Sequence, residues 1–145
     1  MNALPPDPPA IIGRASVIDG DTLEIHGQRI RLWGVDAPES RQTCTRGGAT
    51  YRCGTEAANA LDARIASRPV SCVPYGRPDR YLRVVAICRV GGQDLAAWMV
   101  DRGHALDFPR YSRGAFARQQ GRAQDYRRGV WAGEFQRPWE WRAER

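Results

Sequence analysis

Near the start of the chain the sequence reads Val17-Ile-Asp-Gly-Asp-Thr-Leu-Glu-Ile-His-Gly-Gln-Arg-Ile-Arg-Leu-Trp33. Apolar and polar residues alternate in Thr22–Ile25 and again in Arg29–Trp33, and His26-Gly27 separates the two runs. A period of two is typical of β-strands, and a short connection containing glycine is typical of a hairpin. The pattern predicts a hairpin whose buried face holds Leu23, Ile25, Ile30 and Leu32.

Further elements are expected on both sides of this hairpin. Ala15–Ile18 predicts a strand before it, and a long polar loop is expected at about residues 40–54. Apolar spacing and turn residues predict the following later elements. They are a helix at 55–66, strands at 69–73 and 82–90, a helix at 95–100, a third helix capped by Ser112 and running to about 128, and a Trp-rich tail at 130–142 that packs back on the core.

The order of three strands, a helix, two strands and two helices predicts an α+β fold rich in β-barrel. We expect a five-stranded OB-fold barrel with three α-helices, an architecture that often binds nucleic acids or sugars. With 145 residues, the chain has room for one domain, expected at 13–142 after a flexible Pro-rich arm at 1–12. No apolar run approaches the roughly 20 residues that cross a bilayer, so we expect no membrane segment.

The chain is basic, with a formal net charge of +6, and all 22 basic residues are arginine. A basic surface favours a polyanion such as nucleic acid, an acidic membrane face or an acidic polymer. Arginine binds phosphate through a planar fork, which suits phosphate chemistry. Composition alone is equally compatible with a solvated basic surface.

Four cysteines occur, at Cys44, Cys53, Cys72 and Cys88, and none forms a Cys-x-x-Cys pair. The two histidines are not spaced to join them, so a zinc site is not expected. Four cysteines in a small domain indicate two disulfides and an oxidising compartment, with three pairings open. We therefore expect a secreted or periplasmic protein, with no signal peptide in this chain. Four reduced thiols in a cytoplasmic protein are the alternative.

Carboxylates gather around the first hairpin, at Asp19, Asp21, Glu24, Asp36 and Glu39. Calcium needs several oxygen ligands, and phosphodiester hydrolysis needs positive charge on the phosphate and a group that orients or deprotonates water. Carboxylates at two loop edges, with an arginine on the strand between them, can supply all three. Charges at turns are also ordinary solvated residues, so the composition leaves both interpretations open.

Several short motifs then follow in order along the chain. They are Val17-Ile-Asp-Gly-Asp-Thr-Leu23, Ile30-Arg-Leu32, Val35-Asp-Ala-Pro-Glu39, Asp79-Arg-Tyr-Leu-Arg83, Trp98-Met-Val-Asp-Arg-Gly103, Tyr111-Ser112, Gly129-Val-Trp131 and Trp141-Arg142. In this order and spacing they resemble the signature of the staphylococcal nuclease family. The resemblance covers about residues 14–142, nearly the whole chain.

The resemblance implies a role for each matching position. Asp21 and Asp36 match the calcium-binding carboxylates, with the Ala37 carbonyl as a further ligand, and Asp19 matches an acid that lies near the metal. Arg31 and Arg83 match the two arginines that clamp phosphate, and Glu39 matches the carboxylate that activates or orients the attacking water. The residues that match substrate contacts are Asp79, Arg80, Tyr81 and Tyr111.

The family's activity is then the expected one: Ca²⁺-dependent cleavage of DNA and RNA by a monomer, with low base specificity, leaving a 3′-phosphate. In the family fold the strands that carry Cys72 and Cys88 pair, which implies a bridge between them, and a Cys44–Cys53 bridge across the polar loop. The family commonly has glycine where this chain has Leu82. A positive φ there would strain the leucine.

Two other functions remain possible on sequence grounds. The second is a catalytically idle nucleic-acid-binding module, which occurs when nuclease-like domains lose their acids. The intact set of Asp21, Arg31, Asp36, Glu39 and Arg83 argues against it. A disulfide-stabilised interaction domain with no nucleic-acid partner is the third reading, and the charge and the motifs weigh against it.

Overall fold

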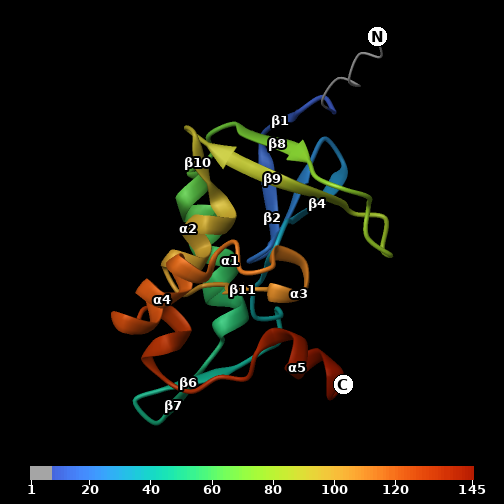
Figure 1. Cartoon of the computed structure of the whole chain (residues 1–145). Coiled ribbons are helices and arrows are strands. Elements are labelled where there is room, and N and C mark those ends of the chain that lie inside the picture. Colours follow the sequence, from blue (N-terminus) through green and yellow to red (C-terminus); the bar gives the residue numbers. More distant parts are fainter. Residues whose placement is uncertain (1–7) are drawn as a thin grey trace.

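The computed structural model describes residues 8–145 (Figure 1). Strand β1 comprises Ile11–Gly13 and pairs with β8. Ile11 and Ile12, which the sequence interpretation assigned to the flexible arm, therefore belong to the sheet, because each has an antiparallel partner in β8. The first part of the expected arm, residues 1–7, lies outside the described residues.

The main sheet begins with the meander predicted from the first hairpin. Its strands are β2 (Ala15–Asp19), β3 (Thr22–Ile25) and β4 (Gln28–Leu32), followed later by β8 (Val70–Pro74), β9 (Val84–Val90) and β10 (Gln93–Asp94). Leu23 lies opposite Ile30 in the β3–β4 ladder. All four apolar residues of the hairpin are buried, as their alternation predicts.

The sheet is curled. Its strand order is β1-β8-β9-β4-β3-β2, with β10 added to β9. The first and last strands of this order, β1 and β2, are consecutive in the chain, so the two ends of the sheet meet at Arg14. β4 and β9 run parallel, while the other neighbours are antiparallel. This curled half-barrel is consistent with the predicted OB fold.

Three main helices accompany the sheet: α1 (Cys53–Ile65), α2 (Leu95–Asp101) and α4 (Ala117–Asp125). Short helical segments α3 (Pro109–Ser112), η1 (Gly129–Ala132) and α5 (Pro138–Ala143) complete the second half. Within residues 8–145 no helix has the length and hydropathy that crossing a bilayer requires.

The prediction that Ser112 caps the third helix was wrong. Ser112 ends α3 instead of capping a long helix, because its hydroxyl donates to the Asp107 carboxylate at 2.5 Å. Arg113 then takes a left-handed conformation with φ of 55°, and Gly114 follows with φ of 89°. The chain therefore leaves the helical path and resumes it only at Ala117.

The segment predicted as a long polar loop, at about residues 40–54, is not a loop throughout. It contains a hairpin of β6 (Cys44–Arg46) and β7 (Ala49–Tyr51), turned by Gly47-Gly48 with positive φ at both residues. Nearby, β5 (Val35–Asp36) pairs with β11 (Leu106–Asp107), which joins the end of the first hairpin to the segment after α2.

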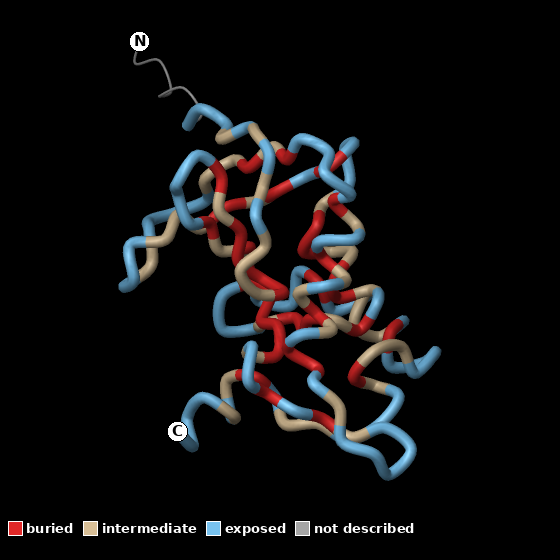
Figure 2. The backbone as a smooth tube through the Cα atoms, turned by 180° about the vertical axis from the view of Figure 1, so that it is seen from behind, coloured by how far each residue is buried: buried red, intermediate tan, exposed pale blue. Residues whose placement is uncertain are grey.

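The buried residues, red in Figure 2, form two clusters by their contacts. The larger one lies between the sheet, α1 and α2 and includes Leu61 and Met99. The smaller one holds Cys44, Cys53, Leu106 and Val130, with Trp131, Phe135 and Trp139 packed on it. The Trp-rich tail does pack back, as predicted, and it does so on this second cluster beside the β6–β7 hairpin (Figure 1).

Both predicted disulfides are present. Cys72 and Cys88 face each other across the β8–β9 ladder and are bridged. Cys44 and Cys53 join β6 to the first residue of α1. The second bridge therefore fixes the β6–β7 hairpin to the helix that follows it.

Candidate active site

Two buried carboxylates lie at one end of the barrel. Asp21 sits in the turn between β2 and β3, next to a β-bulge, and Asp36 ends β5. Asp36 is 0% exposed. Asp21 accepts hydrogen bonds from the Thr22 hydroxyl at 3.0 Å and from the Ala37 N–H at 2.9 Å. The bonds from these neighbours fix the direction in which Asp21 points.

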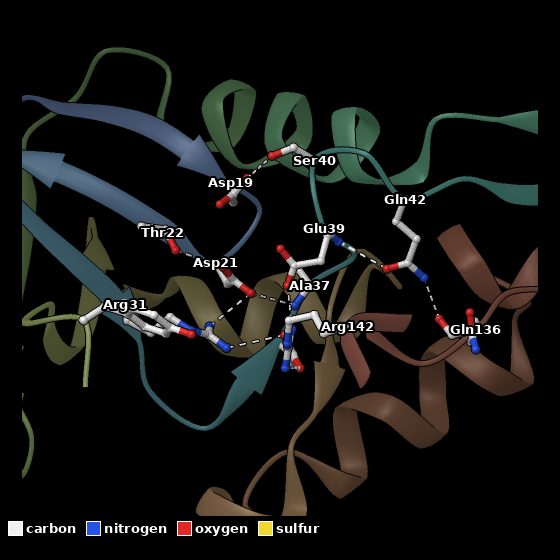
Figure 3. A network of polar contacts seen from close by, with 12 residues as sticks. Asp19, Asp21, Thr22, Arg31, Ala37, Glu39, Ser40, Gln42, Gln136 and Arg142 are labelled. Carbon is white, nitrogen blue, oxygen red and sulfur yellow. Dashed lines mark hydrogen bonds and ion pairs between the residues drawn. The ribbon is translucent and has the colours of Figure 1, made fainter. Parts of the chain in front are cut away.

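Arg31 joins the two carboxylates. It projects from β4, and its Nη1 lies 3.1 Å from Asp21 Oδ2 while its Nη2 lies 3.4 Å from Asp36 Oδ1. One planar guanidinium therefore contacts both acids. Figure 3 shows its contact with Asp21. The structure thus brings together Asp21, Arg31 and Asp36, as the sequence predicted.

A second arginine reaches the same acids from the other end of the chain. Arg142, near the end of α5, donates from Nη1 to Asp36 Oδ1 at 2.9 Å and from Nη2 to Asp36 Oδ2 at 2.7 Å. The same Nη1 lies 2.6 Å from Glu39 Oε1. Glu39 is thereby connected to Asp36 through Arg142. Figure 3 shows Glu39 beside Arg142.

The charges of this centre depend on one another. Burial raises the pKa of Asp36, the neighbouring Asp21 charge raises it further, and the hydrogen bond from Arg142 offsets part of this rise. Hydrogen bonding to Asp36 in turn raises the pKa of Arg142 above its usual range. A buried carboxylate without a cation beside it is unfavourable, so Asp36 requires a positive partner in order to stay ionised.

Glu39 is held from its backbone. Its N–H donates to Gln42 Oε1 at 3.2 Å, and Gln42 Nε2 donates to the Gln136 carbonyl at 2.6 Å. Gln42 is fully buried. It therefore links the loop of Glu39 to the C-terminal tail just before α5 (Figure 3).

Arg83, the second predicted phosphate-binding arginine, lies beside this centre without touching its acids. Its Nε lies 2.7 Å from Asp79 Oδ2, and its Nη1 lies 3.4 Å from the Thr22 hydroxyl, which contacts Asp21. Asp79 also accepts from the backbone N–H groups of Tyr81 and Arg83. Burial alone would raise the pKa of Asp79, but these bonds outweigh it and lower that pKa below its usual value.

Leu82, next to Arg83, has a φ of 62° and is 86% exposed. The residue that departs from the family pattern therefore does occupy a left-handed conformation, which is unfavourable for a side chain. The neighbouring Arg83 makes two hydrogen bonds to Asp79 despite the strain at Leu82.

The remaining predicted residues lie around the edge. The Asp19 carboxylate accepts a hydrogen bond from the Ser40 hydroxyl. Arg80 donates to the exposed Tyr81 hydroxyl at 2.6 Å. Tyr111 is also exposed and packs edge-on against Phe108, with 5.0 Å between ring centroids. These contacts leave their predicted substrate roles as hypotheses.

The donors present suit a hard divalent cation. Asp21 and Asp36 supply carboxylate oxygens close enough to share Arg31, and oxygen is the ligand that calcium prefers. Within residues 8–145, no group of three or more His, Cys, Asp or Glu side chains converges. Two carboxylates therefore fit a cation whose other ligands are main-chain oxygen, water and substrate phosphate. The predicted Ala37 carbonyl ligand stays a hypothesis, since the contact made by Ala37 is through its N–H.

Residues 29–133 match the family model described as staphylococcal nuclease homologue. This is more than half of the chain, and it includes most of the described centre. The chain belongs to the staphylococcal nuclease family. The match ends before α5, so Arg142 lies outside the part of the chain that the family model covers.

Several relatives support this family membership. The chain is 49% identical over 124 residues to the succinoglycan biosynthesis protein ExoI of Rhizobium meliloti, covering 83% of this chain and 64% of the relative. It is 38% identical to the probable staphylococcal-like nuclease CAN4 of Oryza sativa, covering 78% of this chain but 21% of the relative. An uncharacterized endonuclease of Escherichia coli is 29% identical, with 87% of this chain and 80% of the relative covered. The chain thus spans under two thirds of the length of the Rhizobium and Oryza relatives.

Sequence reasoning missed two residues of the centre, Gln42 and Arg142. Gln42 stands in a loop without periodicity, and only its burial reveals its connections. Arg142 was noticed as part of the family-like pair Trp141-Arg142, but nothing in the sequence brings that pair near Asp36. The available signal was a basic residue in a family-like motif near the end of the chain.

Proposed function

We propose that this protein is a calcium-dependent nuclease that hydrolyses phosphodiester bonds of DNA and RNA with low sequence specificity, leaving 3′-phosphate ends. The observation that supports this most is the shared contact of Arg31 with Asp21 and Asp36 in a chain of the nuclease family. Buried acids that share a guanidinium at the edge of a barrel make a compact site for a phosphate and a cation.

In this proposal the arginines bind the phosphate. Arg31 extends from β4 beside the carboxylates, and Arg83 approaches from the segment before β9, aligned by Asp79. The two guanidiniums come from different elements, so they can contact different oxygens of one phosphate. Both would stabilise the charge that grows as the attacking oxygen bonds to phosphorus.

Glu39 would accept a proton from the attacking water or orient that water. Its carboxylate lies on the same side as Asp36, since both contact Arg142, and its side chain is partly exposed. Partial exposure allows water to reach it. The backbone bond to Gln42 holds the loop that carries Glu39, which fixes the position of the proton acceptor.

Asp21 and Asp36, with the Ala37 carbonyl, would hold the cation, and Asp19 would stabilise the loop beside it through Ser40. Bound calcium would supply a positive charge on a nonbridging phosphate oxygen and on the nucleophilic water. Low base specificity is expected because these groups address phosphate and water, which carry no sequence information.

A catalytically idle nucleic-acid-binding module is the alternative, and one observation favours it. Arg142 already neutralises Asp36 and Glu39, the two acids on which cleavage would depend. The Rhizobium relative, named for polysaccharide biosynthesis, also leaves the biological role of such a domain open. A direct assay separates the two functions.

The test is cleavage of end-labelled single-stranded DNA and RNA with calcium and with EDTA, by the unmodified protein and by Glu39→Gln. Glu24→Gln on β3, outside the centre, serves as the matched control. We expect cleavage only with calcium, little change in Glu24→Gln, and a fall of roughly 100-fold or more in Glu39→Gln, as for loss of a group that acts in the transition state.

The ends of the products provide a second measurement. A 3′-phosphate is removed by a phosphatase, which changes the mobility of each fragment. Absence of cleavage by a folded protein that still binds DNA in a salt-dependent way would favour the binding module instead.

A further inference from the structure

We propose that Arg142 takes the place of the divalent cation beside Asp36 in the metal-free protein, and that cation binding expels Arg142 and loosens α5. This inference rests on the proposed calcium requirement and extends it to the C-terminal segment. It assigns to α5 a part in metal binding, although the family match ends before this segment.

The first argument is the occupation of Asp36. Both of its oxygens accept from Arg142, at 2.9 and 2.7 Å, and Arg31 contacts one of them at 3.4 Å. The carboxylate is fully buried, so few other directions of approach remain. These three contacts use three of the roughly four lone-pair sites of the carboxylate, so a cation that binds Asp36 through both oxygens must take a site that Arg142 now uses.

The second argument is charge. Asp21, Asp36 and Glu39 carry three negative charges, and Arg31 and Arg142 supply two positive ones. Arg31 is anchored in the sheet by β4, whereas Arg142 belongs to a terminal helix of six residues. A divalent cation would bring two more positive charges to the same acids. Repulsion is relieved most easily by movement of the arginine on the less constrained element.

The third argument is how weakly α5 is otherwise held. A helix this short is not stable alone and depends on its tertiary contacts. Besides Arg142, α5 is held at its first two residues: Pro138 is buried, and Trp139 packs on the second cluster and stacks on Phe108 with 4.9 Å between centroids and 3° between planes. Gln136, just before the helix, stays tied to Gln42. Release of Arg142 would therefore loosen residues 137–143 and leave the preceding tail in place.

Thermodynamic linkage makes the competition measurable. If calcium and the docked Arg142 exclude each other, removal of the arginine must strengthen calcium binding, and calcium must weaken docking of α5. If Arg142 instead supported the bound cation, for example by orienting Asp36, its removal would weaken calcium binding. The sign of the change distinguishes the two arrangements.

Calorimetric titration of the full chain with calcium, without substrate, measures that sign. Arg142→Gln is compared with the unmodified protein and with Arg145→Gln, which removes an arginine from the same end of the chain. Arg145 forms a surface ion pair with Glu144 at 3.9 Å. We expect Arg142→Gln to bind calcium about tenfold more tightly, since a charge-assisted pair no longer competes, and Arg145→Gln to match the unmodified protein.

Hydrogen exchange of the amides in residues 137–143 provides the independent readout. We expect saturating calcium to speed exchange there in the unmodified protein and not at Gln136, and Arg142→Gln to show fast exchange with or without calcium. Circular dichroism confirms that each variant is folded.

Equal or weaker calcium binding by Arg142→Gln, or α5 amides that calcium leaves protected, would overturn the proposal while calcium-dependent cleavage persists. If no form binds calcium, both this proposal and the calcium requirement fail. The two failures are therefore distinguishable.

Discussion

Leu82 occupies a backbone conformation that glycine adopts more readily. Its φ is 62° and its side chain is 86% exposed, so the leucine makes little packing contact in return for its strain. We expect Leu82→Gly to raise the free energy of unfolding by about 0.5–1 kcal/mol, since relief of strain exceeds the added entropy of the unfolded chain. Urea denaturation measures this change. A lower midpoint, or lost cleavage despite the Asp79–Arg83 contact, would contradict it.

Asp79 accepts two hydrogen bonds from Arg83 and a third from the Tyr81 N–H, and these bonds lower the pKa of Asp79. Because the folded pKa lies below the unfolded value, the stabilisation is present at neutral pH and is lost as pH falls through the folded pKa. We expect Asp79→Asn to lower the free energy of unfolding by about 1–2 kcal/mol at pH 7.

The difference between Asp79→Asn and the unmodified protein should shrink once pH falls below about 4, where the unfolded carboxyl takes up its proton. Urea denaturation at a series of pH values between 7 and 3 measures it. A difference that stays constant over this range would show that the charge of Asp79 contributes nothing. Cleavage should also fall, because Arg83 loses the partner that orients it.

At the scale of elements, the start of α1 is fitted against the loop of Glu39. Gly54 is the second residue of α1, and a Cβ built there would lie 1.8 Å from the Glu39 carbonyl oxygen. Because that neighbour is backbone, the loop itself would have to move. The Cys44–Cys53 bridge holds the other side of the same junction.

We expect Gly54→Ala to lower the free energy of unfolding by about 1–3 kcal/mol and to reduce cleavage by displacing Glu39. Gly121→Ala is the matched control, because a Cβ on this glycine of α4 would meet nothing within 4 Å. That variant should be slightly more stable, since alanine favours helix. Thermal denaturation and the cleavage assay compare them. Equal behaviour of the two variants would refute the proposed fit.

The elements that the sequence predicted well are those with local periodicity. The hairpin around His26-Gly27 and its buried face follow from alternation, and the disulfide pairs followed from the family resemblance. The sequence did not predict the β6–β7 hairpin, because its strands have three residues each and depend on the distant Glu134, which pairs with Thr45. Contacts between residues far apart in sequence leave no periodic signal.

The candidate site also has a part that the sequence predicted and a part that it did not. Asp21, Arg31 and Asp36 lie on adjacent elements of one hairpin and its exit, and the family resemblance assigned all three to one site. Arg142 reaches Asp36 and Glu39 from the opposite end of the chain, through a tail placed only by tertiary packing. The basic charge of α4 and of the segment that follows it is partly neutralised, because Asp101 binds Arg122 and Arg128.

At the scale of the whole molecule, a net charge of +6 does not mean that every arginine is available to nucleic acid. Arg31, Arg83 and Arg142 already face carboxylates. Two exposed arginines near the centre differ from them. Arg41 follows the loop of Glu39, and Arg110 lies in α3 beside Trp139, and neither has an ion pair within the described part of the chain.

Long-range attraction for DNA should therefore come from such unpaired arginines. Binding of single-stranded DNA, measured with Glu39→Gln so that the strand stays intact, should weaken linearly as the logarithm of salt concentration rises. We expect Arg41→Gln with Arg110→Gln to reduce the steepness of that line by about 1.4, twice the roughly 0.7 that each phosphate contact contributes on a single strand.

Arg89→Gln is the matched control for this measurement. It also removes an exposed arginine, but Arg89 lies toward the opposite end of β9 from Val85, the residue that pairs with Arg31. Its loss changes the net charge by the same amount per residue and should leave the slope unchanged, because the slope counts phosphates contacted and not total charge. An equal effect of Arg89→Gln would mean that DNA is attracted by the overall charge, without preference for the face that carries the acids.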